Sequence, residues 1–334
     1  MTTSSDLEWA RAVKAIDGAR QVCLACHVRP DADALGSMLA VLHALCARPG
    51  GGPAVVASFG DEPFEVPAIL RFLPGLELLR RPSDYPSRPE VMLSFDAASI
   101  DRLGVLAGPA DAAGELIVLD HHASNTGFGT INLVDPAGAA TAVLAADLID
   151  RLAIPLTEPI ALGLYAGLVT DTGSFKFAAT TPAVHELAAR LLATGIDPST
   201  VSRELYDRAP FSYLALLAAA CGRAVLEPEA ARGLGLVWTT VTKADRANAG
   251  NLLLDSAESV IDVVRRTEEA EVAAVLKEDN NGAWQISLRS KQAIDVGKAC
   301  AALGGGGHAR AAGFSFSGGA GAAVAALKRQ LDRA

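Results

Sequence analysis

The chain has 334 residues, a length that accommodates two domains, each with a core of its own. Hydrophobic residues make up 50% of it and charged residues 20%, a globular composition that excludes a largely disordered chain. The formal net charge is −9, which disfavours long duplex nucleic acid as a partner, because proteins that bind it normally carry a basic face. Short anionic ligands held through a metal ion remain compatible with this charge.

The apolar segments are too short for a membrane protein. No stretch reaches the roughly 18 consecutive apolar residues that a membrane span requires. The first residues have the pattern of an amphipathic helix rather than that of a signal peptide. The five cysteines, an odd number spread over a long chain, fit reduced thiols better than a disulfide framework. We therefore expect a cytoplasmic protein without a membrane partner.

Short apolar runs alternate with helical patterns through the first two-thirds of the chain. Four runs are expected to be strands, at residues 21–27, 53–59, 91–96 and 115–120. Each is almost continuously apolar, as strands are when helices cover both faces of a parallel sheet. Helical patterns occur at residues 34–48, 182–193 and 199–205. This order predicts an α/β fold with a doubly wound parallel sheet.

The pattern changes after about residue 227. Strands are expected in GLGLVWTTV, EVAAVLKE and AWQISLRS, and the turn-forming DNNG separates the last two. A glycine-rich loop at 304–308 and a final helix complete the chain. We expect a first domain over residues 1–200, a helical linker over 201–225 and a smaller α/β domain over 226–334.

Three of the predicted strands end in residues of the types that bind metal ions. In an open α/β sheet, ligands bind beyond the carboxyl ends of the strands, so these side chains are expected to converge. A further candidate, Asp171, stands where an apolar run ends in Asp-Thr-Gly. The residues at or just after the strand ends are His27, Asp31, Asp33, Asp96, Asp120, His121 and His122.

Carboxylates and imidazoles without sulfur suit Mn²⁺ or Mg²⁺ better than a thiolate zinc site. Carboxylates crowded together repel one another unless cations lie between them. Two cations that share one carboxylate, at a separation of roughly 3.5–4 Å, form the arrangement used for in-line attack on phosphorus. Taken singly, Asp33 could be a helix cap and either histidine a surface residue. The motifs occur together, however, and predict a dinuclear metal site.

In this order, H-x₃-D-x-D, strand-Asp, DHH and DTG resemble the motifs of the DHH phosphoesterase superfamily. The segments ISLRSK and GGGGHARAAGF are similar to the DHH-associated domain. The pairing resembles the bacterial oligoribonuclease (nanoRNase) and 3′-phosphoadenosine 5′-phosphate (PAP) phosphatase family, of which some actinobacterial members degrade cyclic dinucleotides. The resemblance implies two Mn²⁺ per active site, with Mg²⁺ or Co²⁺ as possible substitutes, and a homodimer. Ala32 stands where glycine is frequent in the family.

The resemblance also implies a role for each residue of the site. The first metal would be held by His27, Asp31 and the bridging Asp96. The second metal would be held by Asp33, Asp96, His121 and Asp171. His122 would face the substrate phosphate, where it could stabilise charge or protonate the leaving group. Asp120 would support a neighbouring histidine.

Substrate recognition is expected mainly from the second domain. The backbone of three successive glycines could converge on an anion, with His308 as a side-chain donor, although a flexible turn is the alternative. Arg289 could hold a phosphate through two hydrogen bonds, with Ser290 beside it. In the first domain, Arg102 could reach the phosphate or form a surface salt bridge. The glycines are Gly305, Gly306 and Gly307.

These features lead to the hypothesis of an Mn²⁺-dependent phosphoesterase. Its expected substrates are short oligoribonucleotides, dinucleotides such as pApA or cyclic di-AMP, and PAP, hydrolysed to AMP. A manganese inorganic pyrophosphatase would share the first-domain ligands, but GGGGH-x₃-AGF argues against it. A nucleotide sensor without hydrolysis would be favoured by a missing ligand, and the sequence lacks none of them. The sequence does not rank the substrates.

Overall fold

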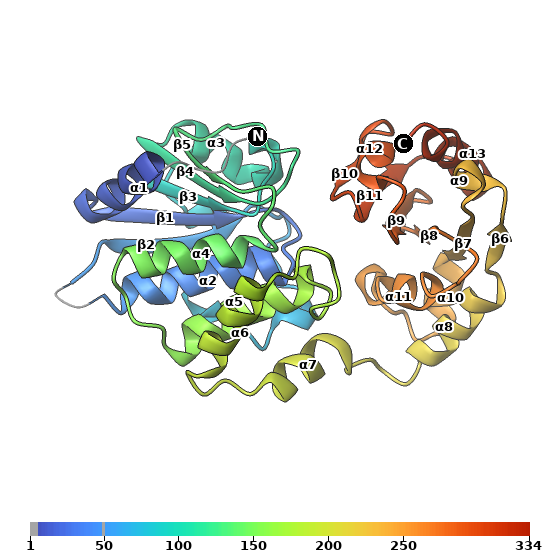
Figure 1. Ribbon diagram of the computed structural model, residues 1–334, viewed down its shortest axis with the longest axis horizontal. Helices are drawn as coiled ribbons and strands as arrows, with labels where there is room; N and C mark the ends of the chain where they lie inside the picture. Colours follow the sequence, from blue (N-terminus) through green and yellow to red (C-terminus); the bar gives the residue numbers. More distant parts are fainter. Residues whose placement is uncertain (1–5, 49–50) are drawn as a thin grey trace. The chain divides into compact units, whose positions relative to one another are not determined.

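The computed structural model describes residues 6–48 and 51–334. It divides the chain into two compact units, Met1–Arg208 and Ala209–Ala334, which we call the N-terminal and C-terminal units (Figure 1). The division falls within residues 201–225, which the sequence suggested as a linker. Each unit is a sheet packed with helices, so the predicted α/β class is confirmed.

The N-terminal unit is built on five parallel strands in the order β2-β1-β3-β4-β5. Four of them lie within one residue of the predicted bounds, and β5 was not predicted because its four residues are too few for a clear pattern. The strands are β1 (Gln21–Cys26), β2 (Ala54–Phe59), β3 (Val91–Phe95), β4 (Glu115–Asp120) and β5 (Ile131–Val134).

Long helices cover one face of this sheet and short ones the other. The first face packs against α1 (Asp6–Gly18), α2 (Ala32–Cys46) and α4 (Thr141–Arg151), and α5 (Glu158–Asp171) packs on α2 and α4 (Figure 1). The second face packs against the 3₁₀ helix η4 (Ile100–Leu106) and α3 (Ala107–Asp111). From β1 the chain adds β2 on one side and β3, β4 and β5 on the other, so the direction in which strands are added changes between β1 and β3. In open sheets of this kind, ligands bind beyond the carboxyl ends of the strands at this point. The unit also contains η1 (Ala68–Leu70), η2 (Leu76–Leu78), η3 (Pro82–Asp84), α6 (Pro182–Leu192) and α7 (Pro198–Tyr206).

Two glycines allow α2 and α5 to cross at close range. A Cβ atom on Gly36 would lie 2.4 Å from the carbonyl oxygen of Gly163, and one on Gly163 would lie 2.5 Å from that of Gly36. One turn further along α5, a Cβ on Gly167 would lie 2.6 Å from Oδ1 of Asp33. Gly163, Gly167 and Asp171 are spaced four residues apart and so share one face of α5. The crossing therefore brings the end of α5 to the beginning of α2.

The C-terminal unit has a mixed six-stranded sheet in the order β10-β11-β9-β8-β7-β6, in which only the β7–β8 pair is parallel among the described residues. The glycine-rich segment, expected as a loop, contributes the two-residue strand β10. The strands are β6 (Val225–Glu227), β7 (Leu236–Val241), β8 (Val272–Glu278), β9 (Trp284–Ser290), β10 (Gly306–Gly307) and β11 (Ala311–Phe316).

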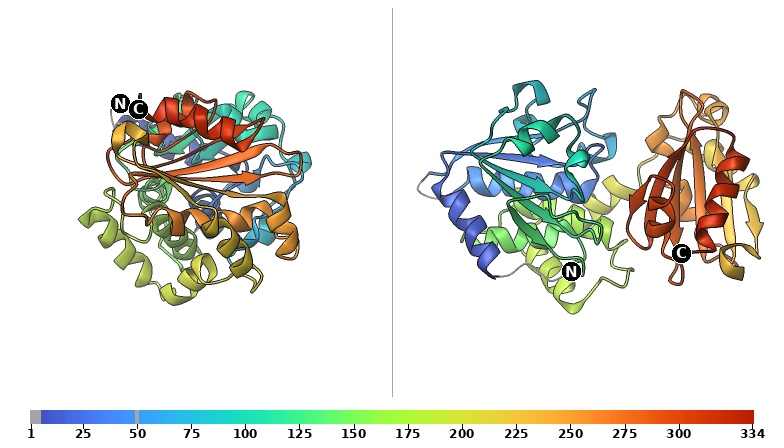
Figure 2. Two further views of the ribbon diagram at one scale, coloured as in Figure 1. Left: turned by 90° about the vertical axis from the view of Figure 1, so that its right-hand side faces the viewer. Right: turned by 90° about the horizontal axis from the view of Figure 1, so that it is seen from above.

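Helices flank this second sheet on both sides (Figure 2). One side packs against α9 (Ala230–Gly233), α12 (Val296–Ala301) and the C-terminal helix α13 (Ala320–Leu331). The other side packs against α8 (Tyr213–Gly222), η5 (Leu254–Ala257) and α11 (Val260–Val264), with α10 (Lys243–Asn248) beside α8. The side chains of β8 alternate between these two cores, as the two-residue period of a strand requires.

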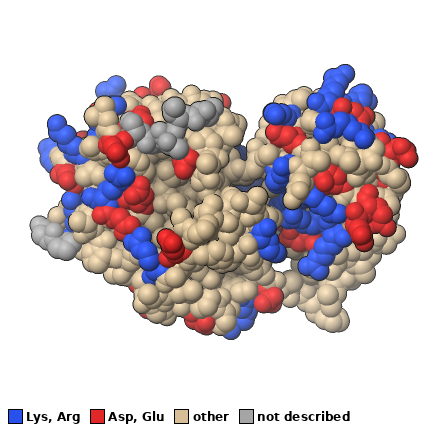
Figure 3. All heavy atoms as spheres, viewed as in Figure 1, with Lys and Arg blue, Asp and Glu red and all other residues tan. Residues whose placement is uncertain are grey.

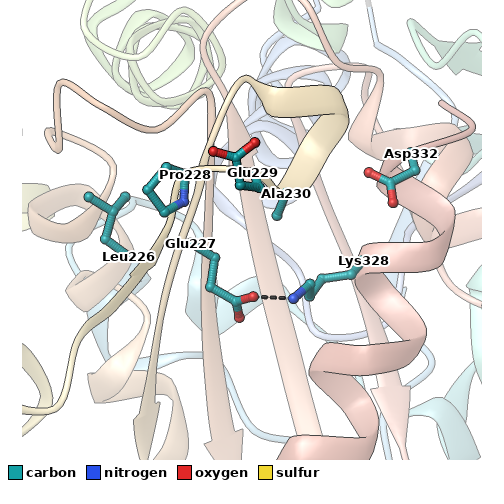
Figure 4. Close-up of a pocket in the computed structure, with 7 residues that line it drawn as sticks. All are labelled: Leu226, Glu227, Pro228, Glu229, Ala230, Lys328 and Asp332. Carbon is teal, nitrogen blue, oxygen red and sulfur yellow. Dashed lines mark hydrogen bonds and ion pairs between the residues drawn. The ribbon is translucent and has the colours of Figure 1, made fainter.

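A surface pocket of the C-terminal unit lies beside β6, α9 and α13 (Figure 4). Glu227 accepts hydrogen bonds there from Lys328 and from the indole nitrogen of Trp238. The lining consists of Leu226, Glu227, Pro228, Glu229, Ala230, Lys328 and Asp332. None of these is a predicted site residue, so the pocket does not belong to the predicted chemistry.

The described surface carries charges of both signs. On the face shown in Figure 3, lysine and arginine side chains lie interspersed with aspartate and glutamate side chains. This face therefore presents no single-sign basic surface of the kind that long nucleic acid requires. Among the helices that the structure describes, none combines the length and the apolar character needed to cross a membrane.

Candidate metal centre

The residues that follow β1, β3 and β4 come together at the carboxyl edge of the N-terminal sheet. His27, Asp31 and Asp96 form one group, whose ligand atoms all lie within 4.8 Å of one another. Asp33, Asp96 and His121 form a second group within the same distance. Asp96 belongs to both groups and is therefore the central residue of the site.

The two oxygens of Asp96 face different histidines. Oδ2 lies 3.4 Å from Nε2 of His27, and Oδ1 lies 3.5 Å from Nε2 of His121. The backbone of Asp96 has a φ of 57°, in the left-handed region that few residues other than glycine adopt. Its N–H donates to the carbonyl of Leu119 on the neighbouring strand at 2.9 Å. Strained backbone of this kind is typical of functional sites.

In the first group, backbone atoms orient His27 and Asp31. Nδ1 of His27 lies 2.9 Å from the carbonyl oxygen of Val28, so Nδ1 carries a proton and Nε2 is the nitrogen that faces the carboxylates. Asp31 is the N-cap of α2, and its Oδ1 accepts hydrogen bonds from the amides of Asp33 and Ala34. Its other oxygen lies 3.7 Å from Nε2 of His27.

In the second group, His121 is oriented in the same way. Its Nδ1 lies 3.1 Å from the carbonyl oxygen of Gly138. Its Nε2 lies 3.1 Å from Oδ2 of Asp171, the last residue of α5, and 3.8 Å from Oδ2 of Asp33. The crossing of α2 and α5 thus delivers a carboxylate from each helix to the same imidazole.

Asp33 is fully buried and is held by the N-terminus of α4. Its Oδ2 accepts from the amide of Thr141 at 2.6 Å, and its Oδ1 accepts from the amide of Ala142 at 2.9 Å. These amides have no partner within their own helix, and the helix dipole favours negative charge at this end. Ser37 also donates to Oδ1, at 3.3 Å.

The crowding of acidic groups shifts their pKa values. Burial raises the pKa of Asp33 well above its usual range, and the charges of Asp171 and Asp96 raise it further. Burial also raises the pKa of Asp171, to about 6. The pKa of His27 rises to about 10, because hydrogen bonds with Asp31 and Asp96 outweigh the lowering effect of burial. The protein thus compensates its buried negative charge with protons, a task that divalent cations would take over.

The donor geometry fits hard divalent cations. Two donors that each lie about 2.1 Å from one ion, at right angles to one another, are about 3 Å apart. The observed separations between Nε2 atoms and carboxylate oxygens run from 3.1 to 3.8 Å. The set contains only imidazole nitrogens and carboxylate oxygens, which excludes a thiolate site and suits Mn²⁺ or Mg²⁺.

Comparison with known proteins decides the family. Residues 21–168 match the DHH family, N-terminal domain, and residues 251–333 match the DHHA1 domain. The chain is 33% identical over 312 residues to the bifunctional oligoribonuclease and PAP phosphatase NrnA of Thermus thermophilus, with 92% of this chain and 87% of that protein covered. The chain belongs to the DHH/DHHA1 phosphoesterase family. The predicted family and the predicted enzyme class, a phosphoric ester hydrolase, are therefore confirmed.

Two further relatives agree with this DHH/DHHA1 assignment. The probable bifunctional oligoribonuclease and PAP phosphatase NrnA of Streptococcus mutans is 25% identical over 293 residues, with 86% of each chain covered. The crystal structure of an exopolyphosphatase-related protein from Bacteroides fragilis superposes with a TM-score of 0.85 at 22% identity, over 100% of this chain and 98% of that one. The latter likeness is one of fold.

In this DHH phosphoesterase, the aspartate of the triplet orients the second histidine. Asp120 is fully buried, and its Oδ1 lies 2.7 Å from Nδ1 of His122. Its Oδ2 accepts from Nδ2 of Asn125 at 2.6 Å. Burial acts to lower the pKa of His122, but the hydrogen bond with Asp120 and the charge of Asp96 raise it above its ordinary value. Asn125, Asp120 and His122 thus form a continuous hydrogen-bonded chain.

Arg102 lies beside the first donor group. Its Nη2 is 3.3 Å from Nδ1 of His27. Arginine can only donate, and Nδ1 of His27 already donates to Val28, so this contact is a close approach rather than a hydrogen bond. Burial lowers the pKa of Arg102, and the neighbouring charge of Arg29 lowers it further. The guanidinium of Arg102 thus stands beside His27, within the influence of the charge of Arg29.

The predicted substrate residues of the C-terminal unit have different surroundings. Arg289 is half-buried on β9, where Nη1 donates to the carbonyl of Leu288 and Nη2 lies 3.9 Å from Oε1 of Glu258. Ser290 is 2% exposed and its hydroxyl donates to Glu271 at 2.8 Å. The hydroxyl of Ser290 is thus engaged inside the unit, which argues against its predicted contact with substrate.

In the GGGGH segment, the fold requires glycine at Gly305 and Gly307 but leaves open space beside Gly306. A Cβ on Gly305 would lie 2.1 Å from the carbonyl oxygen of Gly313, and Gly307 has a φ of 134°, so close packing and backbone conformation require glycine at both positions. A Cβ on Gly306 would meet nothing within 4 Å. The amide of His308 donates to the carbonyl of Ala311 at 2.7 Å, which closes the β10–β11 hairpin.

Several residues that support the centre were not found from the sequence. Thr141 contacts both Asp33 and Asp96, Asn125 holds Asp120, and Gly167 makes room for Asp33. Asn125 follows the DHH triplet closely, and that proximity was a usable signal. Thr141 and Gly167 stand in alanine- and leucine-rich helices, where nothing in the local pattern distinguishes them.

Proposed function

We propose that this phosphoesterase hydrolyses short oligoribonucleotides to mononucleotides, hydrolyses dinucleotides such as pApA to AMP, and removes the 3′-phosphate of PAP to leave AMP. Cyclic di-AMP is a further proposed substrate. The observation that carries the proposal is the position of Asp96, whose two oxygens face the imidazoles of two separate donor groups. Relatives whose names describe an oligoribonuclease and PAP phosphatase support the substrate class.

The proposed cofactor is a pair of Mn²⁺ ions, for which Mg²⁺ or Co²⁺ could substitute. Bound at this centre, they would place positive charge on the phosphoryl oxygens and lower the pKa of an attacking water. The first ion would be held by His27, Asp31 and Asp96. The second ion would be held by Asp33, Asp96, His121 and Asp171.

His122 is proposed to act on the phosphoryl group. Asp120 fixes its Nδ1 at 2.7 Å, which determines the direction of the ring. Its pKa is raised above that of a free histidine, which favours the imidazolium form relative to an unperturbed side chain. An imidazolium can stabilise charge on phosphoryl oxygens or give a proton to the leaving oxygen. Asp120 is proposed as the residue that orients His122, and Asp96 as the bridging carboxylate.

Substrate binding is proposed to use residues of both units. Arg289, with a planar group that can make two parallel hydrogen bonds, is suited to the far phosphate or the 5′ end. Gly306, where the backbone leaves open space, and His308 beside it are proposed to contribute further donors, with Gly305 and Gly307 shaping the hairpin. Arg102 is proposed to contact the phosphate at the metal centre. A homodimer and a cytoplasmic location are proposed from the family relationship.

The test is a comparison of hydrolysis rates on PAP, pApA, cyclic di-AMP and pyrophosphate with Mn²⁺ present. We expect AMP from PAP and pApA and no turnover of pyrophosphate. Turnover of pyrophosphate alone would favour a manganese pyrophosphatase instead. Nucleotide binding without turnover would favour a sensor.

A further inference from the structure

We infer that Thr141 is a positioning residue that aligns the bridging carboxylate of Asp96 with the ligand Asp33. It is the first residue of α4 and is fully buried. Its Oγ1 lies 2.8 Å from Oδ1 of Asp96, and its backbone N–H donates to Oδ2 of Asp33 at 2.6 Å. The inference rests on the proposed function, because it concerns the metal centre proposed there.

The hydroxyl of Thr141 is the donor of this hydrogen bond, and Oδ1 of Asp96 is the acceptor, at 2.8 Å. A hydroxyl carries its own hydrogen, and a carboxylate oxygen offers lone pairs to accept it. Hydrogen bonds to a charged acceptor are stronger than those between neutral groups.

This hydrogen bond restrains the rotation of the Asp96 carboxylate. Oδ1 accepts from Thr141 and also faces Nε2 of His121 at 3.5 Å. With Oδ1 held there, Oδ2 is directed toward Nε2 of His27, at 3.4 Å. A carboxylate oxygen has two lone pairs, so Oδ1 keeps one for a cation while it accepts from the hydroxyl. The hydroxyl thus keeps Oδ1 of Asp96 on the side of His121 and Oδ2 on the side of His27.

The backbone N–H of Thr141 contacts the other proposed ligand, Asp33. The amides of Thr141 and Ala142 both donate to Asp33, across 108 and 109 residues of chain. Any shift of α4 therefore moves both Asp33 and the hydroxyl that is hydrogen-bonded to Asp96. Of these two contacts, only the one to Asp96 uses the side chain, so a side-chain substitution removes the hydrogen bond to Asp96 and leaves the backbone donor to Asp33 in place.

A purely structural role for the hydroxyl is the competing explanation. In that case, loss of the hydroxyl would lower the stability of the metal-free protein and leave its metal affinity unchanged. A positioning role requires the affinity for metal to fall, because outer residues that orient a ligand typically contribute about 10- to 100-fold to metal affinity. The two explanations differ in metal binding, so activity is not needed to separate them.

The experiment compares Thr141→Val, which removes the hydroxyl and keeps the shape, with Thr141→Ser, which keeps the hydroxyl. Thr141→Ala is a second variant without the hydroxyl, in case the valine variant does not fold. Thr239→Val is the matched control, because Thr239 is equally buried and its hydroxyl donates to the carbonyl of Ala220 in the C-terminal unit. Mn²⁺ binding to metal-free protein is measured by titration calorimetry, and the Mn–Mn coupling is measured by electron paramagnetic resonance.

We expect Thr141→Val and Thr141→Ala to lose about 10- to 100-fold in Mn²⁺ affinity and to show an altered coupling signal. Thr141→Ser and Thr239→Val are expected to bind Mn²⁺ as the parent does. Parent-like affinity and coupling in both variants without the hydroxyl would overturn the inference. A parent protein that binds two Mn²⁺ but hydrolyses none of the nucleotides would refute the proposed function alone, since the affinities would still decide the role of Thr141. A parent that binds no Mn²⁺ would refute both.

Discussion

Nδ1 of His122 lies 2.7 Å from Oδ1 of Asp120, a carboxylate that is fully buried in the N-terminal unit. The other oxygen of Asp120 accepts from Asn125, so the carboxylate cannot rotate away from the imidazole. The same imidazole nitrogen lies 3.6 Å from Oδ1 of Asp96. The histidine proposed to act on the phosphoryl group is therefore hydrogen-bonded to Asp120 and lies close to Asp96, the carboxylate proposed to bridge the metals.

Replacing Asp120 by asparagine is expected to lower kcat by about 10²- to 10⁴-fold, the usual contribution of a positioned acid or base. KM should change little, because Asp120 is buried away from solvent. Since Asp120 helps to raise the pKa of His122, its loss lowers that pKa, and the alkaline limb of the kcat profile should move to lower pH. The profile of kcat against pH checks this. An unchanged alkaline limb would show that His122 is not the titrating acid.

Asp96→Asn tests the bridging assignment. Asparagine has the shape of aspartate and tolerates the left-handed backbone found here, whereas alanine would add strain. We expect kcat to fall by at least about 10³-fold, because two-ion catalysis depends on the shared carboxylate. The number of bound Mn²⁺ ions should fall below two, with an unchanged circular dichroism spectrum. Near-normal turnover would contradict the assignment.

Gly167→Ala tests the helix crossing that brings α5 to Asp33. The new Cβ would lie 2.6 Å from Oδ1 and 2.9 Å from Cα of Asp33, so α5 must shift. We expect a loss of about 1–3 kcal/mol in the free energy of unfolding, as for other overpacked sites, together with weaker Mn²⁺ binding. Gly108→Ala is the matched control, since a Cβ there meets nothing within 4 Å. Thermal melts and Mn²⁺ titrations of both variants decide the matter; equal behaviour would argue against the crossing as a constraint on Asp33.

Mn²⁺ binding is expected to weaken as the pH falls from 8 to 6. In the metal-free protein the pKa of His27 is raised to about 10, so its imidazole is protonated over this range and must lose a proton to bind a metal. Calorimetric titrations in buffers of different ionisation enthalpy should therefore detect proton release. A pH-independent affinity without proton release would contradict the role of His27 as a ligand.

The same shifts predict how stability depends on pH. A raised folded-state pKa stabilises the metal-free protein below the unfolded-state value, and this contribution is lost as the pH rises through the folded-state value. For His27 the loss extends from about 6.5 to about 10, and for Asp171 from about 3.9 to about 6. The Tm gap between the Mn²⁺-loaded and metal-free protein should therefore widen from pH 6 to pH 8. Melts at a series of pH values test this, and a constant gap would count against it.

Arg289→Ala tests substrate binding by the C-terminal unit. Loss of a charge-assisted hydrogen bond of about 1.5–3 kcal/mol should raise KM for PAP and pApA about 10- to 100-fold, with kcat changed much less. Arg223→Ala is the control, because Arg223 is an exposed arginine of the same unit that pairs with Asp245. Steady-state kinetics on both substrates distinguish the two variants. A fall in kcat at constant KM would assign Arg289 to a different role.

The sequence by itself determined the fold class and the donor set. Nearly continuous apolar runs locate four of the five strands of the N-terminal sheet, because buried parallel strands leave this local pattern. Because a strand ends where its apolar run ends, the polar residues that follow it can be named from the sequence. His27, Asp96 and His121 were found in this way, and the structure brings all three together. The short strand β5 left too little pattern to be found.

Only the tertiary structure decided how those donors are held. The two oxygens of Asp96 are assigned to different histidines by a hydroxyl 45 residues away, on a helix that the local pattern does not connect to the site. Ser290 stands next to Arg289 in the sequence, yet its hydroxyl bonds to Glu271 inside the unit. A local pattern records which side chains are apolar and where strands end. The direction of a side chain depends on packing between segments distant in sequence, such as the crossing at Gly36 and Gly163, and a periodicity along the chain does not contain that information.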